Sequence, residues 1–128
     1  IGELIARENA RGIPSGKIVL AGFSQGGAVA LQTGLRHPEK LAGVMALSTY
    51  LPLADSFAQE ATPANAKTSV FMAHGTHDPV VPYAMGRNSC ALLEKAAYAV
   101  EWHEYPMQHS VCLEEVADIG RWLVKVLG

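Results

Sequence analysis

Short apolar runs alternate with longer segments of helical spacing, and this alternation constrains the fold more than any other feature of the chain. Four of the runs have the length of β-strands, at residues 17–23, 41–48, 69–74 and 100–105. Four segments have the spacing of helices, at residues 1–9, 25–36, 82–97 and 113–127. Strands that alternate with helices build βαβ units, so the pattern predicts an α/β fold, with a mostly parallel sheet of about four strands and helices on both faces.

The individual runs predict their own places in this fold. Residues 17–23 are apolar without alternation, which is typical of a strand buried on both faces. Residues 100–105 alternate and carry charges, which indicates a strand nearer an edge. The last helical segment has an apolar face made of Val116, Ile119, Leu123 and Val126. Functional groups of such sheets gather beyond the carboxyl ends of the strands, so the loops after the four runs should carry the chemistry.

The composition is that of one globular domain, expected to cover residues 1–128. Apolar residues make up 49% and charged residues 17%, a balance that excludes a disordered chain. The net charge is -2 and the basic residues are scattered, so nucleic acid is not an expected partner. No apolar run approaches the roughly 20 residues of a membrane helix, and residues 1–11 lack the pattern of a signal peptide. We therefore expect a cytoplasmic protein without stable membrane insertion.

The two cysteines, Cys90 and Cys112, have no spacing that is typical of a metal site. Two free thiols are the simpler interpretation in a reducing compartment. A Cys90–Cys112 disulfide stays open at this point, because it depends on geometry that the sequence does not give.

The sequence Gly22-Phe23-Ser24-Gln25-Gly26 lies between the first apolar run and a helical segment. It matches the G-x-S-x-G pattern, in which a serine sits on a sharp turn between a strand and a helix. The flanking glycines let strand and helix approach closely, and the turn exposes the Ser24 hydroxyl above the helix N-terminus, where an oxyanion is stabilised. The backbone N–H of Gln25 is the expected first oxyanion donor. The five-letter pattern also occurs by chance, so the interpretation of Ser24 as a nucleophile depends on the position of the pattern between a strand and a helix.

Asp78 is the candidate acid that such a serine requires. A serine nucleophile needs a base held in one orientation by a third group, and the chain order in this class of fold is serine, acid, histidine. Asp78 follows the third apolar run, in a loop that Pro79 and Pro82 stiffen. The alternative is that Asp78 only caps a turn, because Asp-Pro favours turns. The glutamates that fall within predicted helices or strands are weaker candidates: Glu94, Glu101 and Glu104.

His109 is the candidate base, because it lies between the fourth apolar run and the last helical segment. The alternative is an ordinary loop histidine. The other histidines compete poorly, since His37 ends a helix and His103 lies within the charged strand. His74 and His77 lie in the loop of the candidate acid, and we expect both to order that loop through hydrogen bonds.

These residues resemble the phospholipase/carboxylesterase family of α/β-hydrolases, which includes the acyl-protein thioesterases. The similar stretches cover nearly the whole chain, at residues 12–15, 22–28, 41–44, 46–52, 74–75, 78–82 and 107–110. The resemblance implies that Ser24 is the nucleophile, Asp78 the acid and His109 the base of a catalytic triad. It implies a serine esterase or thioesterase that cleaves a small acyl ester or thioester through an acyl-enzyme, without a metal or a cofactor.

The resemblance also has two implications for the surroundings of the triad. Leu51 and Pro52 resemble a loop that borders the substrate groove. Gln108 departs from the family pattern, in which a small residue, often glycine, precedes the histidine, so we expect Gln108 to narrow the approach to His109.

Members of this family are longer than the chain, so the resemblance implies the C-terminal half of an α/β-hydrolase fold. Four further strands and a glycine-rich loop with the second oxyanion N–H are expected in a preceding part. In such a half, residues 17–23 form an unprotected apolar edge, which favours pairing with another chain or homo-oligomers. Two alternatives stay open: a weakly active or inactive half that serves as a binding or assembly module through this edge, and a related hydrolase such as a peptidase or a dienelactone-type enzyme.

Overall fold

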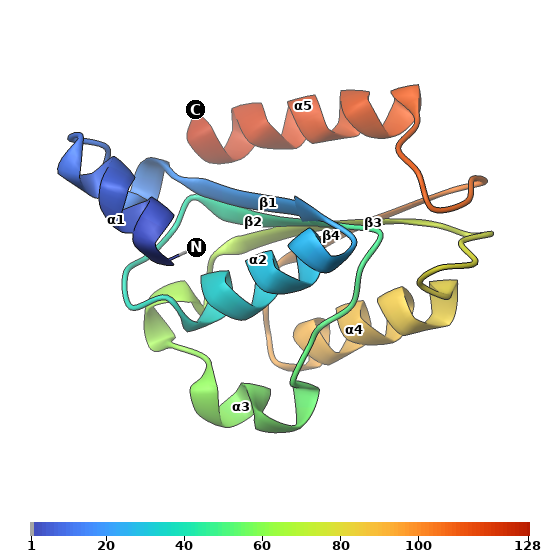
Figure 1. Ribbon diagram of the computed structural model, residues 1–128, viewed down its shortest axis with the longest axis horizontal. Coiled ribbons are helices and arrows are strands. Elements are labelled where there is room, and N and C mark those ends of the chain that lie inside the picture. The colour runs from blue at the N-terminus through green and yellow to red at the C-terminus, as the bar shows by residue number, and fades with distance from the viewer. Residues whose placement is uncertain (1) are drawn as a thin grey trace.

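The centre of the structure, a computed structural model that describes residues 2–128, is a four-stranded sheet in the order β1-β2-β3-β4. The strands are β1 (Val19–Phe23), β2 (Gly43–Leu47), β3 (Ser69–Gly75) and β4 (Val100–Tyr105). All three neighbouring pairs are parallel. The carboxyl ends of the strands therefore meet at one edge of the sheet, as Figure 1 shows, and the predicted α/β class with a parallel sheet is confirmed.

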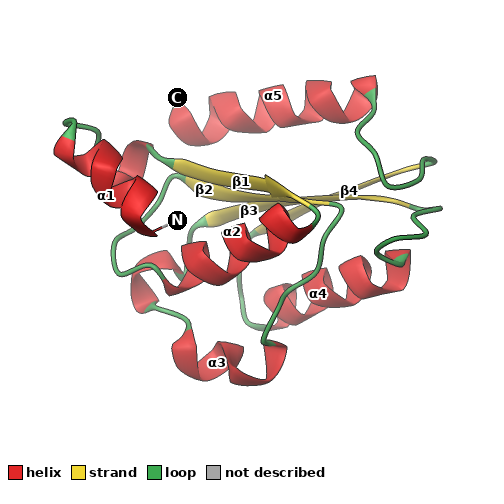
Figure 2. Cartoon of the chain, viewed as in Figure 1, coloured by secondary structure: helices red, strands yellow, loops and turns green. Residues whose placement is uncertain are grey.

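Helices cover both faces of this sheet, as predicted. The helices are α1 (Gly2–Ala10), α2 (Gln25–Arg36), α3 (Phe57–Glu60), α4 (Tyr83–Lys95) and α5 (Leu113–Leu127). Helix α5 lies on one face, whereas α2, α3 and α4 lie on the other (Figure 2). The helix predicted at 82–97 is shorter in the structure, because Pro82 has an extended ψ of 139° and Ala97 a positive φ of 71°. The sequence pattern predicted no element in the segment that contains α3.

Each face of the sheet has its own apolar core. The larger core lies on the α2 and α4 side and includes Leu31, Leu35, Val44, Val70, Met72 and Leu93. The smaller core lies under α5 and consists of Met45, Phe71, Ala73, Tyr105 and Trp122. Strands β2 and β3 supply side chains to both cores, so the centre of the sheet is held rigidly between two packed layers.

Strand β1 is an edge strand, and the prediction that residues 17–23 are buried on both faces is wrong. Ala21 and Phe23 are exposed, and no strand within residues 2–128 pairs with the outer side of β1. Among residues 2–128, the separate expectation that 17–23 lies at an edge of the sheet is confirmed. The other edge is β4, in agreement with its charged, alternating sequence.

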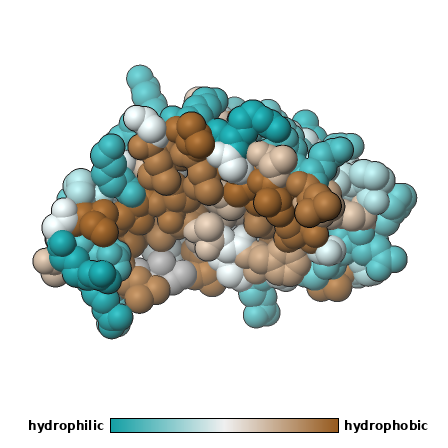
Figure 3. Space-filling view, turned by 90° about the horizontal axis from the view of Figure 1, so that it is seen from above, coloured by the Kyte–Doolittle hydropathy of each residue, from teal (hydrophilic) through white to brown (hydrophobic). Residues whose placement is uncertain are grey.

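The buried face of α5 differs from the predicted one. Val116 is 54% exposed, whereas Trp122 and Glu115 are buried. Ile119, Leu123 and Val126 pack against the smaller core as predicted. The side of the molecule that carries α5 also displays a broad apolar surface, shown in Figure 3.

Candidate active site

Ser24 occupies a tight turn between β1 and α2. Its backbone angles are φ 56° and ψ -121°, a conformation that is costly for a residue with a Cβ. The turn is this tight because strand and helix touch at Gly22, where an added Cβ would lie 2.1 Å from the carbonyl oxygen of Gly26. The predicted need for glycine at position 26 itself is not seen, since a Cβ there would meet no atom within 4 Å apart from its chain neighbours and the backbone of its own helix.

Asp78 lies in the loop after β3 with a buried side chain and uses both carboxylate oxygens. Its Oδ1 accepts hydrogen bonds from the N–H groups of Val80, at 2.8 Å, and Val81, at 2.9 Å. Its Oδ2 faces His109. The carboxylate therefore caps the turn and also contacts the candidate base, so the two interpretations of Asp78 are not exclusive.

The pKa of Asp78 lies below its usual value. Burial alone would raise this pKa, but hydrogen bonds from His109 and from the backbone N–H groups of Val81 and Val80 outweigh it. Asp78 is therefore ionised near neutral pH, and an ionised carboxylate can only accept hydrogen bonds.

His109 connects the other two predicted residues. Its Nδ1 lies 2.6 Å from Asp78 Oδ2, and its Nε2 lies 3.0 Å from Ser24 Oγ. Since Asp78 only accepts, Nδ1 carries the proton, which leaves Nε2 of the neutral imidazole as the acceptor for the Ser24 hydroxyl. The Phe23 ring packs on the imidazole with 4.7 Å between the ring centroids. The structure thus brings Ser24, His109 and Asp78 into one hydrogen-bonded chain.

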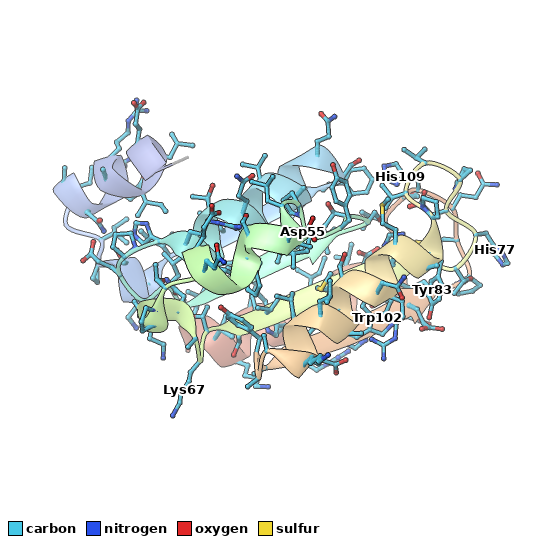
Figure 4. The ribbon with its side chains drawn as sticks, turned by 90° about the horizontal axis from the view of Figure 1, so that it is seen from below. Asp55, Lys67, His77, Tyr83, Trp102 and His109 are labelled. Atoms are coloured by element: carbon cyan, nitrogen blue, oxygen red, sulfur yellow. The ribbon has the colours of Figure 1, made fainter. Side chains whose placement is uncertain are left out.

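The two histidines of the acid loop behave differently from each other. His74 is buried, and its Nε2 donates to the carbonyl oxygen of Val81 at 2.8 Å, so the predicted loop-ordering bond is present. The side chain of His77 is exposed and has no hydrogen-bond partner within residues 2–128, which makes the prediction wrong for that side chain. The backbone N–H of His77 instead donates to Met107, at 3.1 Å. Figure 4 shows His77 and His109 at the same end of the molecule.

The remaining predicted site residues differ in exposure. The Gln25 N–H begins α2 directly after Ser24. Leu51 is buried in the larger core, and its N–H donates to Ser89 Oγ at 2.9 Å, whereas Pro52 is half-buried. Gln108 has an exposed side chain. Their roles in an oxyanion site and a substrate groove stay predictions.

The sequence patterns missed Thr49, the second residue after the end of β2. Its hydroxyl donates to the carbonyl oxygen of Ser24 at 2.6 Å. The rule that side chains beyond strand ends carry chemistry pointed to this position, but no motif distinguished Thr49 from its neighbours.

Three further features concern the cysteines, metal ions and the membrane. Cys90 and Cys112 are free thiols, and burial raises the pKa of Cys90 to about 11. Among the described residues, no three His, Cys, Asp or Glu side chains gather in a way that could hold a metal ion. No helix in the described part of the chain is long and apolar enough to cross a membrane.

Comparison with protein families matches residues 1–127 to the family described as Phospholipase/Carboxylesterase. Acyl-protein thioesterase 1 of Mycosarcoma maydis is 49% identical over 90% of this chain and 50% of its own length. Acyl-protein thioesterase 1 of Neurospora crassa is 47% identical over 98% of this chain and 52% of its own length. The chain thus spans about half the length of these curated relatives.

Solved structures share the fold. The crystal structure of SOBER1 from Arabidopsis thaliana superposes with a TM-score of 0.93 at 30% identity, over 99% of this chain and 61% of that one. Acyl-protein thioesterase 2 of Zea mays superposes with a TM-score of 0.86 at 26% identity, over 99% of this chain and 62% of that one.

Proposed function

This chain belongs to the phospholipase/carboxylesterase family, and we propose that it carries the catalytic triad of a serine hydrolase that cleaves carboxylic ester or thioester bonds. The observation that carries the proposal is the unbroken hydrogen-bonded chain from Ser24 Oγ through His109 to Asp78. It starts at a strained serine beside a helix N-terminus, where an attacking oxygen and a developing oxyanion would both be accommodated.

In the proposed reaction, His109 Nε2 removes the proton of the Ser24 hydroxyl while Oγ attacks the acyl carbon. The Gln25 N–H stabilises the oxyanion, and Asp78 stabilises the imidazolium and keeps Nδ1 protonated. The imidazolium then gives its proton to the leaving alcohol or thiol as the acyl-enzyme forms. A water molecule, deprotonated by His109, attacks the acyl-enzyme and releases the carboxylic acid and Ser24.

The names of the curated relatives support a thioester substrate, because the relatives at 47–49% identity are acyl-protein thioesterases. The coarser statement, hydrolysis of a small acyl ester or thioester, covers both the family description and these relatives. The alternative of a non-enzymatic binding module finds no support in the comparisons.

A fluorophosphonate probe tests the nucleophile directly, because it phosphonylates only an activated serine. We expect the chain to be labelled at Ser24, and Ser24→Ala to abolish both labelling and hydrolysis of a p-nitrophenyl ester. Ser110→Ala is the matched control, since Ser110 is an exposed serine beside His109 and outside the triad. Labelling that persists in Ser24→Ala would show that the proposed nucleophile is wrong.

A further inference from the structure

Thr49 joins the end of β2 to the turn that carries Ser24. The residue is 1% exposed, and its hydroxyl donates to the carbonyl oxygen of Ser24 at 2.6 Å. The two residues are far apart in the sequence but close in space, because β1 and β2 pair in parallel up to Phe23 and Leu47 and each residue follows the end of one of these strands.

The backbone of Ser24 is held on both sides by this end of β2. The Ser24 N–H donates to the carbonyl oxygen of Leu47 at 2.8 Å, and the Ser24 carbonyl accepts from Thr49. The same carbonyl also accepts the first helical hydrogen bond, from Ala28, at the longer distance of 3.1 Å. Thr49 and the Ala28 N–H therefore hold the Ser24 carbonyl together, at a ψ of -121° for Ser24, and Thr49 makes the shorter of the two contacts.

The hydrogen bond to the Ser24 carbonyl also constrains the Gln25 N–H, the predicted oxyanion donor. The carbonyl of Ser24 and the N–H of Gln25 belong to the same planar peptide, in which they point in opposite directions. A donor that fixes the carbonyl therefore fixes the direction of the N–H. A hydrogen bond to the carbonyl also polarises the peptide, which makes its N–H a stronger donor.

The methyl group of Thr49 packs against the first turn of α2. A Cβ added at Gly27 would lie 2.7 Å from Thr49 Cγ2 and 2.9 Å from Thr49 Cβ. A β-branched side chain has few rotamers, so this packing keeps the hydroxyl aimed at Ser24.

We propose that Thr49 is a positioning residue, which orients and polarises the Ser24–Gln25 peptide so that the Gln25 N–H can stabilise the oxyanion. The proposal rests on the proposed hydrolase function and adds to it a group that acts through the backbone.

Two substitutions separate the hydroxyl from the shape of the side chain. Thr49→Val keeps the branched shape and removes the donor, whereas Thr49→Ser keeps the donor. Thr68→Val is the matched control, because Thr68 is equally buried and donates through its hydroxyl to Asn65, but lies before β3 at the opposite end of the sheet.

Hydrolysis kinetics and the carbonyl resonance of Ser24 are measured on the same proteins. We expect Thr49→Val to lower kcat roughly tenfold with little change in KM, less than the 10²–10³ that follows loss of a whole oxyanion donor. Thr49→Ser should recover most of this loss, and Thr68→Val should leave kcat unchanged. With ¹³C-carbonyl serine, the Ser24 resonance should move upfield in Thr49→Val only.

The two readouts keep this proposal distinct from the proposed function. An unchanged Ser24 resonance in Thr49→Val, or a change in KM alone, would overturn the role of Thr49. A wild-type chain that is neither labelled nor active would overturn the hydrolase function, and the carbonyl resonance would then decide by itself whether Thr49 holds the peptide.

Discussion

Two of the four residues other than glycine that have a positive φ within residues 2–128 lie where the chain leaves β1 and β2. Ser24 follows β1 and has a φ of 56°, and Ser48 follows β2 with a φ of 52°. Such conformations persist only where the surroundings impose them. At Ser24 the surroundings are the close contact at Gly22 and the hydrogen bonds from and to β2.

The two glycines of the serine motif should respond differently to a methyl group. Gly22→Ala would place its Cβ against the backbone of Gly26, and neither backbone can move without opening the turn. We expect a loss of about 3 kcal/mol or more in the free energy of unfolding. In Gly26→Ala the added methyl group lies in α2 and meets no atom outside that helix within 4 Å. The free energy of unfolding should therefore be unchanged or higher by about 0.5 kcal/mol.

Urea denaturation of both variants measures this difference. Equal destabilisation by the two substitutions would show that the close contact at Gly22 is not what holds the turn.

At the level of elements, α5 combines an apolar face with one buried carboxyl. Glu115 lies in the first turn of the helix and is fully buried. Burial raises its pKa to about 7; the nearby N–H of Cys112 and His103 oppose the shift, and Asp118 adds to it. The position near the N-terminus of the helix favours a negative charge but does not compensate for the loss of water.

The pKa of Glu115 predicts how the stability of the fold changes with pH. In the unfolded chain, the carboxyl ionises near pH 4.5, whereas in the folded chain it keeps its proton up to about pH 7. Between these values the folded state binds more protons, so the contribution of Glu115 to the free energy of unfolding falls as the pH rises. The amide of Glu115→Gln does not ionise, so this variant does not lose stability in the same way. By about pH 8 its free energy of unfolding should have risen by up to about 3 kcal/mol relative to that of wild type.

Denaturation curves at about pH 4.5 and about pH 8 test this prediction. Glu114→Gln is the matched control, because Glu114 lies in the same turn of α5 but is exposed. A difference between wild type and Glu115→Gln that does not depend on pH would contradict the prediction.

At the scale of the whole molecule, the two edges of the sheet have opposite character. Strand β4 presents charged residues, among them Glu101 and Glu104, which discourage pairing. Strand β1 has the sequence VLAGF, without a charge, and its Ala21 and Phe23 are exposed. An apolar strand with a free row of backbone groups can pair with another strand.

We expect the chain to associate through β1 as its concentration rises. Ala21→Lys places a charge in the middle of this edge and should shift the association to higher concentration. Leu92→Lys is the control, because Leu92 is an exposed apolar residue, at 48%, on α4 beneath the other half of the sheet. Sedimentation velocity over a range of concentrations measures both, and a wild-type chain that stays monomeric throughout would contradict the expectation.

The local sequence was sufficient to predict the four strands, every helix except α3, and the candidate triad. Periodicity predicted α2, β4 and α5 with the bounds that the structure has. Ser24, Asp78 and His109 could be assigned because each follows a strand, and parallel strands bring such residues to the same edge of a sheet.

Contacts between distant segments decided the rest. The exposure of β1 depends on whether a neighbouring strand is present, and the burial of Glu115 and Leu51 depends on what packs against them, so no spacing within one segment could indicate either. The hydrogen bond from Thr49 to Ser24 is of the same kind, because a side chain after one strand meets the backbone after another only when the sheet has formed. The sequence by itself determined which residues are candidates for the chemistry, because motif and chain order are local, and only the tertiary structure decided which groups hold these candidates in place.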